Sequence, residues 1–332
     1  MFKLKNWGIA AALALTTAGA MASNFRAADQ VYLPIGGHIQ GGNALFVSDV
    51  FISNLSTDTV TVSVIFSSGT NTGNAAPQTS FAPITLGPLE RRELLDFFGN
   101  NLGITNGLGM VIFNACKQGA DCSAATQDAS GFSPNFRNIS VESRIYSTIS
   151  GVNGTTGQDI AGMPWYSFVT MDQAATGLDR VFITGIRNTP QYRTNIGIVN
   201  ASQYSRDMQI RLTLFSSTGA VLGTTTRTLG PLGQEQQSVG NLFGAAFPTA
   251  VTSTGAWVQV EQVASNPTAD APQGCTTTGC PAFFAYGSQL DNATGDPTTL
   301  ESQYFKPLTD AQILAIYPTT AGKSAVRRVA RH

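Results

Sequence analysis

Short segments in which apolar and polar residues alternate recur along most of this 332-residue chain. Between residues 59 and 66 every second side chain is apolar, and the same holds between residues 208 and 215. A period of two places the apolar side chains on one face of a β-strand. Because a sheet with one apolar face needs a second sheet to cover it, the pattern predicts an all-β protein of the sandwich type.

A five-residue string, Thr-Leu-Gly-Pro-Leu, occurs at residues 85–89 and again at residues 228–232. Each copy follows a strand-like segment. Gly-Pro ends regular structure, because proline lacks an N–H and fixes φ whereas glycine tolerates unusual backbone angles. We therefore interpret the string as a fixed corner between two strands, at which at least one leucine of each copy is buried. Its recurrence predicts a tandem duplication.

Both repeats carry the same order of apolar segments, separated by the Gly, Pro, Ser and Asn residues that favour turns. In the first repeat we predict strands at 31–35, 45–53, 59–66, 79–86, 109–114 and 139–148, with a Gly-rich turn at 36–42. In the second we predict strands at 181–183, 195–200, 208–215, 221–229, 257–260 and 283–290, with Phe215-Ser216-Ser217 echoing Phe66-Ser67-Ser68. Residues 90–95 suit either a helix or an edge strand, and Asp96 is placed to cap a short helix.

These segments predict two tandem immunoglobulin-like β-sandwich domains, each with a short helix. The predicted domains span residues 29–150 and 177–300, and residues 151–176 connect them. The connector contains Met163-Pro164-Trp165-Tyr166, so we expect it to pack against its neighbours. Residues 301–332 are predicted to form a short helix and a basic tail.

Residues 1–22 have the features of a signal peptide. Lys3 and Lys5 precede an apolar segment at 7–15, which is too short to span a bilayer, and Ala20-Met21-Ala22 has the small-x-small form of a cleavage site. The alternative is an uncleaved anchor. We expect cleavage before Ser23 and a secreted protein in the periplasm, on the cell surface or outside the cell, with no later transmembrane segment.

Charge is scarce, which excludes some classes of partner. Charged residues make up 12% of the sequence, compared with about 25% in ordinary soluble proteins. Removing residues 1–22 deletes two lysines and no acid, so the formal net charge changes from −1 to −3. No global positive field remains to attract nucleic acid or anionic lipid. A surface of small polar residues suits an extracellular or envelope protein that packs against neighbours.

Four cysteines form two close pairs, Cys116 with Cys122 and Cys275 with Cys280. In an exported chain, an even number of cysteines at short spacing predicts disulfides, and two local bonds are the simplest of the three connectivities. The alternative is one zinc site, for which both pairs would have to converge, although neither spacing is typical of zinc. We expect no cofactor.

One order of motifs recurs in both halves: strand, Asn-x-Ser, alternating strand, Thr-Leu-Gly-Pro-Leu, Asp/Asn-x-Phe-Gly, strand, loop, strand. Over about residues 29–300, this order resembles a duplicated β-sandwich unit of exported bacterial proteins of unassigned function. The resemblance implies a sandwich fold for each repeat. It implies no activity, and no site residues carry over from it.

Candidate catalytic and metal-binding groups are few. His38 could in principle activate a serine, but no Gly-x-Ser-x-Gly motif accompanies it, so an exposed loop histidine is the simpler interpretation. Glu90, Glu93 and Asp96 lie near two arginines, which favours solvated, locally paired charges. Residues 291–296 could bind calcium, but they lack the closing glutamate of an EF-hand, which favours a plain turn.

Aromatic residues offer a second kind of site. Trp165 follows a proline in the connector and is, with neighbouring Tyr166, the better candidate for a surface contact with a sugar or a protein. A contact between the two domains is the alternative for Trp165. Trp257 lies in an alternating strand, so we expect it in the core.

The sequence therefore favours an exported, non-enzymatic structural or adhesive module. Its partners are expected to be other envelope or extracellular proteins, a cell-surface polymer, or copies of itself, and not nucleic acid. The alternative function is a carbohydrate-binding module that uses exposed aromatic residues such as Trp165. No residue of the chain is assigned a catalytic role.

Overall fold

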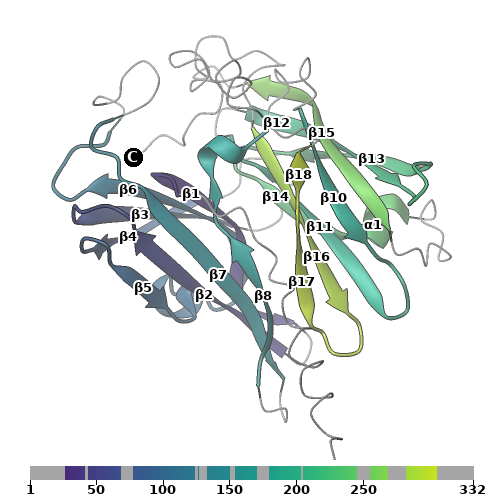
Figure 1. The fold of residues 1–332 in the computed structure, drawn as a ribbon, viewed down its shortest axis with the longest axis horizontal. Coiled ribbons are helices and arrows are strands. Elements are labelled where there is room, and N and C mark those ends of the chain that lie inside the picture. Colours follow the sequence, from purple (N-terminus) through teal and green to yellow (C-terminus); the bar gives the residue numbers. More distant parts are fainter. Residues whose placement is uncertain are drawn as a thin grey trace, which may run out of the picture.

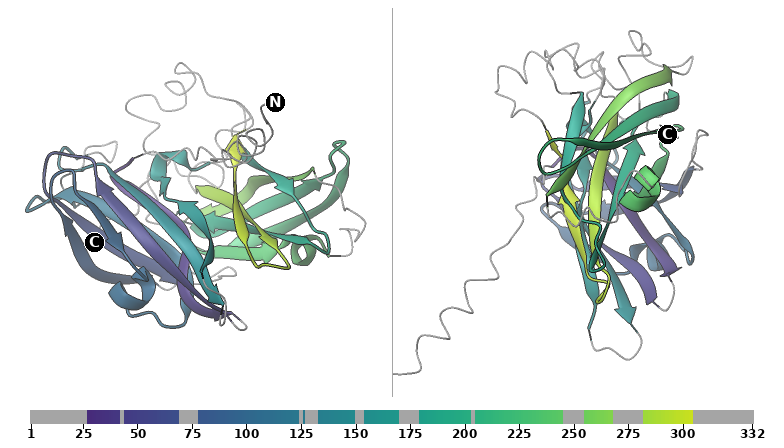
Figure 2. Two further views of the ribbon diagram at one scale, coloured as in Figure 1. Left: turned by 60° about the horizontal axis from the view of Figure 1, so that its bottom comes forward. Right: turned by 90° about the vertical axis from the view of Figure 1, so that its right-hand side faces the viewer.

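The computed structural model describes residues 27–41, 44–68, 78–123, 126, 133–149, 154–169, 179–202, 205–244, 255–267 and 282–304. Antiparallel strands dominate these residues, so the protein is all-β, as the sequence predicts. Figure 1 shows two groups of strands side by side, and the further views show the same two groups (Figure 2). We call residues up to 169 the first half and residues from 179 on the second half.

The first half forms two sheets. Their strands are β1 (Gln30–Gly41), β2 (Ala44–Asn54), β3 (Val60–Ser68), β4 (Gln78–Leu86), β5 (Arg91–Leu94), β6 (Gly107–Lys117), β7 (Ile139–Ile149), β8 (Thr156–Ala161) and β9 (Met163–Pro164). Sheet A has the order β5-β2-β7-β8, and sheet B has the order β4-β3-β6-β1-β9. Strand β1 joins them, because its first residues pair with β6 and its last residues pair with β2.

The second half also forms two sheets. Their strands are β10 (Arg180–Ile186), β11 (Tyr192–Asn200), β12 (Ser205–Phe215), β13 (Val221–Leu229), β14 (Gln234–Ser238), β15 (Ala256–Pro267), β16 (Phe283–Asp291), β17 (Pro297–Glu301) and β18 (Gln303–Tyr304). Sheet C has the order β14-β11-β16-β17, and sheet D has the order β13-β12-β15-β10-β18. When the strands are numbered along each half, sheet C therefore has the same strand order as sheet A. Sheet D likewise has the same strand order as sheet B.

Each half is a β-sandwich with an apolar interior. Ile52 of sheet A shares one buried cluster with Val64 and Phe113 of sheet B. Between sheets C and D, a second cluster joins Ile198 to Leu212 and other buried residues. The prediction from the alternating pattern is confirmed, because every second side chain of β3 and β12 lies in the interior of its sandwich.

A short helical turn closes one edge of each sandwich. In the first half, the π-helical turn η1 (Phe97–Asn101) begins at Asp96, whose side chain accepts a hydrogen bond from the Gly99 N–H. In the second half, α1 (Val239–Phe243) begins at Ser238, whose side chain accepts from the Asn241 N–H. The short helix expected in each repeat is therefore present, and residues 91–94 form the edge strand β5.

The two halves are joined by an apolar contact. The outward faces of sheets B and C pack on each other, so that Leu232 and Phe284 of the second half belong to the buried cluster of the first. The Phe168 ring stacks on Phe284, with ring centroids 5.1 Å apart, and meets the edge of the Tyr32 ring at 4.7 Å. Strands β8 and β17 lie side by side where the halves meet (Figure 1), and the Thr299 hydroxyl donates to the Asp159 carbonyl at 2.6 Å.

The two Thr-Leu-Gly-Pro-Leu strings adopt the same corner conformation. Leu89 has a φ of 55° and donates its N–H to the Ser56 carbonyl, whereas Leu232 has a φ of 53° and donates to the Ser202 carbonyl. An asparagine amide holds the glycine carbonyl of each string, Asn54 to Gly87 at 2.7 Å and Asn200 to Gly230 at 2.8 Å. The two strings are therefore equivalent corners in three dimensions.

Burial of the corner leucines is confirmed, but it is unequal between the halves. Leu86 and Leu229, which end β4 and β13, are both fully buried. Leu232 is fully buried as well, whereas Leu89 is 68% exposed. The difference arises because Leu232 packs against the first half, whereas Leu89 lies on the outward side of the first half.

One predicted turn is wrong. The Gly-rich segment at 36–42 is not a turn, because β1 continues to Gly41. Gly36 and Gly37 allow close packing there: a Cβ on Gly36 would lie 2.5 Å from the Phe98 ring, and one on Gly37 would lie 2.6 Å from the Gly107 carbonyl. The connector at 151–176 packs against its neighbours as expected, and it does so partly as strands, since β8 and β9 pair with strands of sheets A and B.

The disulfide Cys116–Cys122 is present, as predicted. Cys275 and Cys280 lie outside the described residues, as do the predicted signal peptide at 1–22 and, from residue 305 on, the helix and basic tail predicted at 301–332. No helix within the described ranges is long and apolar enough to cross a membrane.

Candidate functional site

The most distinctive surface feature is a group of three aromatic side chains on the outward face of sheet D. We call Phe182 of β10, Phe215 of β12 and Trp257 of β15 the aromatic patch. Phe215 and Trp257 are cross-strand partners whose rings stack almost parallel, with centroids 4.0 Å apart and planes 8° apart. The Phe182 ring lies 5.5 Å from Trp257. All three are partly exposed to solvent.

Strand alternation explains why these rings face outward. Leu212 and Leu214 of β12 and Val258 of β15 are fully buried between sheets C and D. Because side chains of a strand alternate between its faces, Phe215 and Trp257, each one residue away, must lie on the opposite face. The expectation that Trp257 is in the core is therefore wrong.

The proposed match of Phe215 with Phe66 is wrong by one residue. Leu214 pairs with Val258, as Phe66 pairs with Val111, so Leu214 holds the position of Phe66. Phe215 instead corresponds to Ser67. A one-residue shift moves a side chain to the other face of the sheet, so Phe66 is buried whereas Phe215 is partly exposed.

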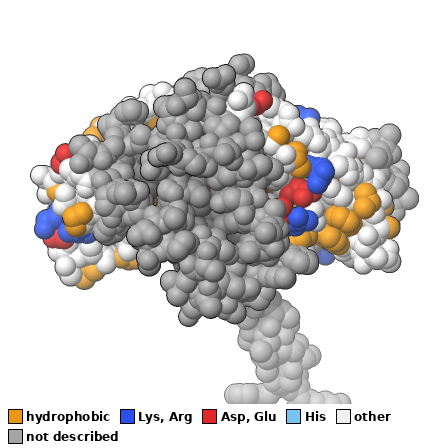
Figure 3. Space-filling view, turned by 90° about the horizontal axis from the view of Figure 1, so that it is seen from above, with side chains coloured by type: hydrophobic (Ala, Val, Ile, Leu, Met, Phe, Trp, Pro, Cys, Tyr) orange, Lys and Arg blue, Asp and Glu red, His pale blue; other side chains and the backbone are white. Residues whose placement is uncertain are grey.

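Charged groups border the aromatic patch. Glu261 of β15 is buried. Its carboxylate forms an ion pair with the Arg211 guanidinium at 2.8 Å and accepts a hydrogen bond from the Gln259 amide at 3.0 Å. Arg180 of β10 lies 3.8 Å from Glu261, and its hydrogen bond to Asp179 raises the pKa of the guanidinium. The space-filling view shows hydrophobic side chains gathered beside acidic and basic ones on the second-half side of the molecule (Figure 3). Apolar rings with a polar rim are typical of binding surfaces.

Trp165 is not a surface residue, contrary to expectation. It is 8% exposed, and its indole N–H donates to the Asp29 carboxylate at 3.1 Å. It belongs to the buried cluster that contains the core of the first half. The side chain of Tyr166, in the turn η3 (Trp165–Ser167), lies outside what the structure describes.

His38 is also not in an exposed loop. It lies in β1, and its Nδ1 atom is 2.9 Å from a carboxylate oxygen of Asp96, the cap of η1. The Asp96 N–H in turn donates to Asp49 at 2.8 Å. The histidine thus ties β1 to the helical turn, and this arrangement is structural.

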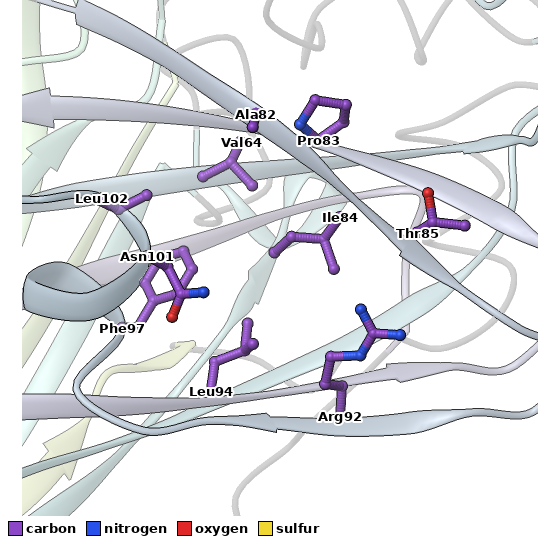
Figure 4. Close-up of a pocket in the computed structure, with 10 residues that line it drawn as sticks. All are labelled: Val64, Ala82, Pro83, Ile84, Thr85, Arg92, Leu94, Phe97, Asn101 and Leu102. Carbon is purple, nitrogen blue, oxygen red and sulfur yellow. The ribbon is translucent and has the colours of Figure 1, made fainter.

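A pocket of about 240 Å³ opens between β4 and β5, at the edge where sheets A and B separate (Figure 4). Its walls combine apolar side chains such as Ile84 and Leu94 with polar atoms, and Arg92 lies at one side. The Arg92 guanidinium is bound to Glu90, with Nε 2.9 Å from the carboxylate. Ligand pockets usually measure about 300–1,000 Å³ and bring several polar groups together. This small opening is therefore a weaker candidate site than the aromatic patch.

The segment at 291–296 forms a turn. The Asp291 carboxylate accepts the N–H groups of Ala293 and Thr294 at 2.7 Å and 3.1 Å, and Gly295 has a φ of 73°. Among the residues that the structure describes, no group of three His, Cys, Asp or Glu side chains could hold a metal ion. The turn interpretation is thus the one that its hydrogen bonds support.

Sequence reasoning missed Phe182 and Phe215 and placed Trp257 on the wrong face. The signal was present in the alternation itself. Residues 208, 210, 212 and 214 are apolar and in phase, so Phe215 is out of phase with them. Trp257 is likewise out of phase with Val258 and Val260. Out-of-phase aromatic residues in a half-buried strand indicate an apolar outer face.

Comparisons with known proteins give little further information. No protein-family model matches the chain, and no curated protein sequence matches it. β-Glucuronidase 2 from Bacteroides uniformis, covalently bound to cyclophellitol-6-carboxylate aziridine, is 8% identical over 82% of this chain and 25% of its own, with a TM-score of 0.15. A β-glucuronidase from Parabacteroides merdae is 8% identical over 85% of this chain and 36% of its own, with a TM-score of 0.14. TM-scores this low carry no argument about fold or activity.

Proposed function

We propose that this protein is an exported, non-enzymatic structural or adhesive module, and that the aromatic patch is its binding surface. The observation that carries the proposal is the stacked pair of Phe215 and Trp257 on the outward face of sheet D. Soluble proteins rarely leave several large apolar side chains together on a surface unless that surface binds something. Tryptophan in particular supplies much of the binding energy at protein interfaces.

We further propose that the two halves are copies of one immunoglobulin-like sandwich unit. Sheets B and D share the strand order, and so do sheets A and C. The equivalent corners at Leu89 and Leu232 support the same interpretation. Export is supported by the signal-like sequence at 1–22 and by the Cys116–Cys122 disulfide, because disulfides persist in oxidising compartments.

Binding to bacterial envelopes tests the proposal. The mature chain, starting at Ser23, is incubated with isolated envelopes, and the retained fraction is compared with that of a Trp257→Gln variant. Loss of a central tryptophan commonly costs about 2 kcal/mol or more, so we expect retention to fall by at least about 10-fold. Trp165→Phe is the control, since Trp165 is buried in the cluster that contains the core of the first half and is not part of the aromatic patch, so its replacement should leave binding unchanged.

Equal retention of the wild type and the Trp257→Gln variant would contradict the assignment of the surface. Circular dichroism of each variant checks that a loss of binding is not a loss of folding. Treating the envelopes with protease before the assay abolishes retention if the partner is a protein.

A carbohydrate-binding module is the second candidate. Its original motivation, an exposed Trp165, does not hold, because Trp165 is buried. The aromatic patch replaces it, since flat rings on a sheet face can stack on sugars. Retention that survives protease, disappears after periodate oxidation of the envelopes and requires Trp257 would favour this candidate over a protein partner.

A further inference from the structure

The contact between the two halves uses one sheet face of each half, and each half also has the counterpart of the face that the other half uses. Sheet C, through Leu232, packs on the outward face of sheet B. The Ser67 hydroxyl on that face donates to the Leu232 carbonyl at 3.0 Å. In the second half, sheet D corresponds to sheet B, and in the first half, sheet A corresponds to sheet C. The outward faces of sheets A and D are thus counterparts of two faces that bind each other.

The counterpart of Leu232 is exposed. Leu89 has the same left-handed backbone and the same corner hydrogen bond, yet 68% of it is accessible to solvent. Leu55, the residue before Ser56, is 52% exposed beside it. Its own counterpart, Ala201, is 1% exposed in the contact between the halves. We call Leu55 and Leu89 the leucine corner.

The counterpart of the receiving surface is the aromatic patch. Ser67 pairs with Met110 across β3 and β6, and Phe215 pairs with Trp257 across β12 and β15. Phe215 therefore occupies in sheet D the position that receives Leu232 in sheet B. Val221 pairs with Phe215 and is 61% exposed. Three of the four large hydrophobic side chains that are exposed among the described residues, Leu55, Leu89 and Val221, thus lie on these two surfaces.

From this correspondence we infer that the partner of the aromatic patch is the leucine corner of a second copy of this chain. The second copy places sheet A on sheet D as sheet C lies on sheet B within one chain. This inference rests on the proposed function, because it names the partner of the proposed surface. The contact is heterologous, so each copy keeps one surface of each kind and the association extends head to tail.

The charges on the two surfaces are compatible with this contact. Arg91 and Glu142 lie 3.6 Å apart on the outward face of sheet A, with 56% and 37% of their side chains exposed. Arg211 beside Glu261 borders the aromatic patch, with 46% of the arginine side chain exposed. Both surfaces therefore carry positive and negative groups around an apolar centre, so neither repels the other by its net charge, and rim charges of this kind set orientation.

Sedimentation velocity of the mature chain and its variants tests the inference. Leu89→Asn removes the leucine corner with a residue that tolerates positive φ, and Val221→Lys disrupts the aromatic patch at an exposed position on an edge strand. We expect the average mass of the wild type to rise with concentration, and we expect each variant alone to remain monomeric. Leu95→Asn, at a 57% exposed leucine that belongs to neither the leucine corner nor the aromatic patch, should associate like the wild type.

Mixing gives the decisive result. An equimolar mixture of the Leu89→Asn and Val221→Lys variants contains one intact surface of each kind, so it should form one-to-one dimers and nothing larger. A wild type that stays monomeric up to about 1 mM, association that survives Leu89→Asn, or a mixture that stays monomeric would each overturn the inference. If a monomeric chain still shows Trp257-dependent retention on envelopes, this inference fails while the proposed function stands.

Discussion

At the scale of single residues, two leucines with the same backbone have opposite surroundings. Leu89 and Leu232 follow Gly-Pro, have φ values of 55° and 53°, and make the same hydrogen bond. Leu232 is fully buried because the first half covers it, whereas Leu89 is 68% exposed. Comparing Leu89 with Leu232 therefore separates the contribution that packing between the halves makes to stability from the contribution of the corner conformation.

We expect Leu232→Ala to lower the free energy of unfolding by about 2–5 kcal/mol, the usual cost of truncating a buried leucine. Leu89→Ala makes the same chemical change in the same backbone conformation and should cost less than about 0.5 kcal/mol in the monomer. Urea denaturation at low protein concentration, followed by circular dichroism, measures both values. Similar losses for the two variants would show that the corner conformation, rather than the contact between halves, determines the effect.

How well the burial of a residue could be predicted depends on which elements cover it. Leu86 and Leu229 end alternating strands, and their burial follows from the local pattern. Trp165 and Trp257 lie in environments opposite to those expected, although the phase of Trp257 in its strand already indicated an outward face. Trp165 is covered by elements from distant parts of the sequence, and Trp257 is uncovered because no described element packs on sheet D there. The phase of a strand shows which face a side chain lies on, but whether another element covers that face leaves no local signature in the sequence.

At the scale of elements, the strands themselves were largely predictable, but their ends were not. Alternation located β3, β12 and most other strands, and the capping residue Asp96 located η1. The Gly-rich segment was the exception, since glycine usually favours turns. In β1 the glycines instead remove side chains where Phe98 and the Gly107 backbone come close.

This explanation predicts that a single methyl group at Gly36 is costly. In Gly36→Ala the Cβ would lie 2.5 Å from the ring of Phe98, which is fully buried and held against Phe66 and Phe97. We expect a loss of about 1–3 kcal/mol in the free energy of unfolding, as for other overpacked cores. Gly240→Ala in α1 is the control, because its Cβ meets nothing closer than 3.9 Å and alanine favours a helix. Thermal denaturation measures the stability of both variants. If Gly36→Ala proved as stable as the control, the explanation would be wrong.

At the scale of the whole molecule, the apolar contact between sheets B and C makes the two halves one structure. Val199, Phe284 and Leu232 of the second half belong to the same buried cluster as the core of the first half. Burial raises the pKa of Tyr286 within this contact, and its hydroxyl donates to Gln236 at 3.0 Å. The sequence predicted two sandwiches in series but could not predict this contact, because the residues that form it are spread over β3, β11, β16 and the segment at 165–169.

The shared cluster predicts how the molecule unfolds. If the halves were joined only by a connector, Leu86→Ala would lower the melting temperature of the first half alone, and Leu229→Ala that of the second half alone. Because the halves share buried apolar area, we expect calorimetry of the mature chain to show one transition, and we expect both substitutions to lower it. Each truncates a fully buried leucine, so the shifts should be similar. Phe168→Ala removes the ring between Tyr32 and Phe284 and should split the transition in two. Two transitions in the wild type, each moved by only one leucine variant, would instead show that the contact between sheets B and C is too weak to couple the halves.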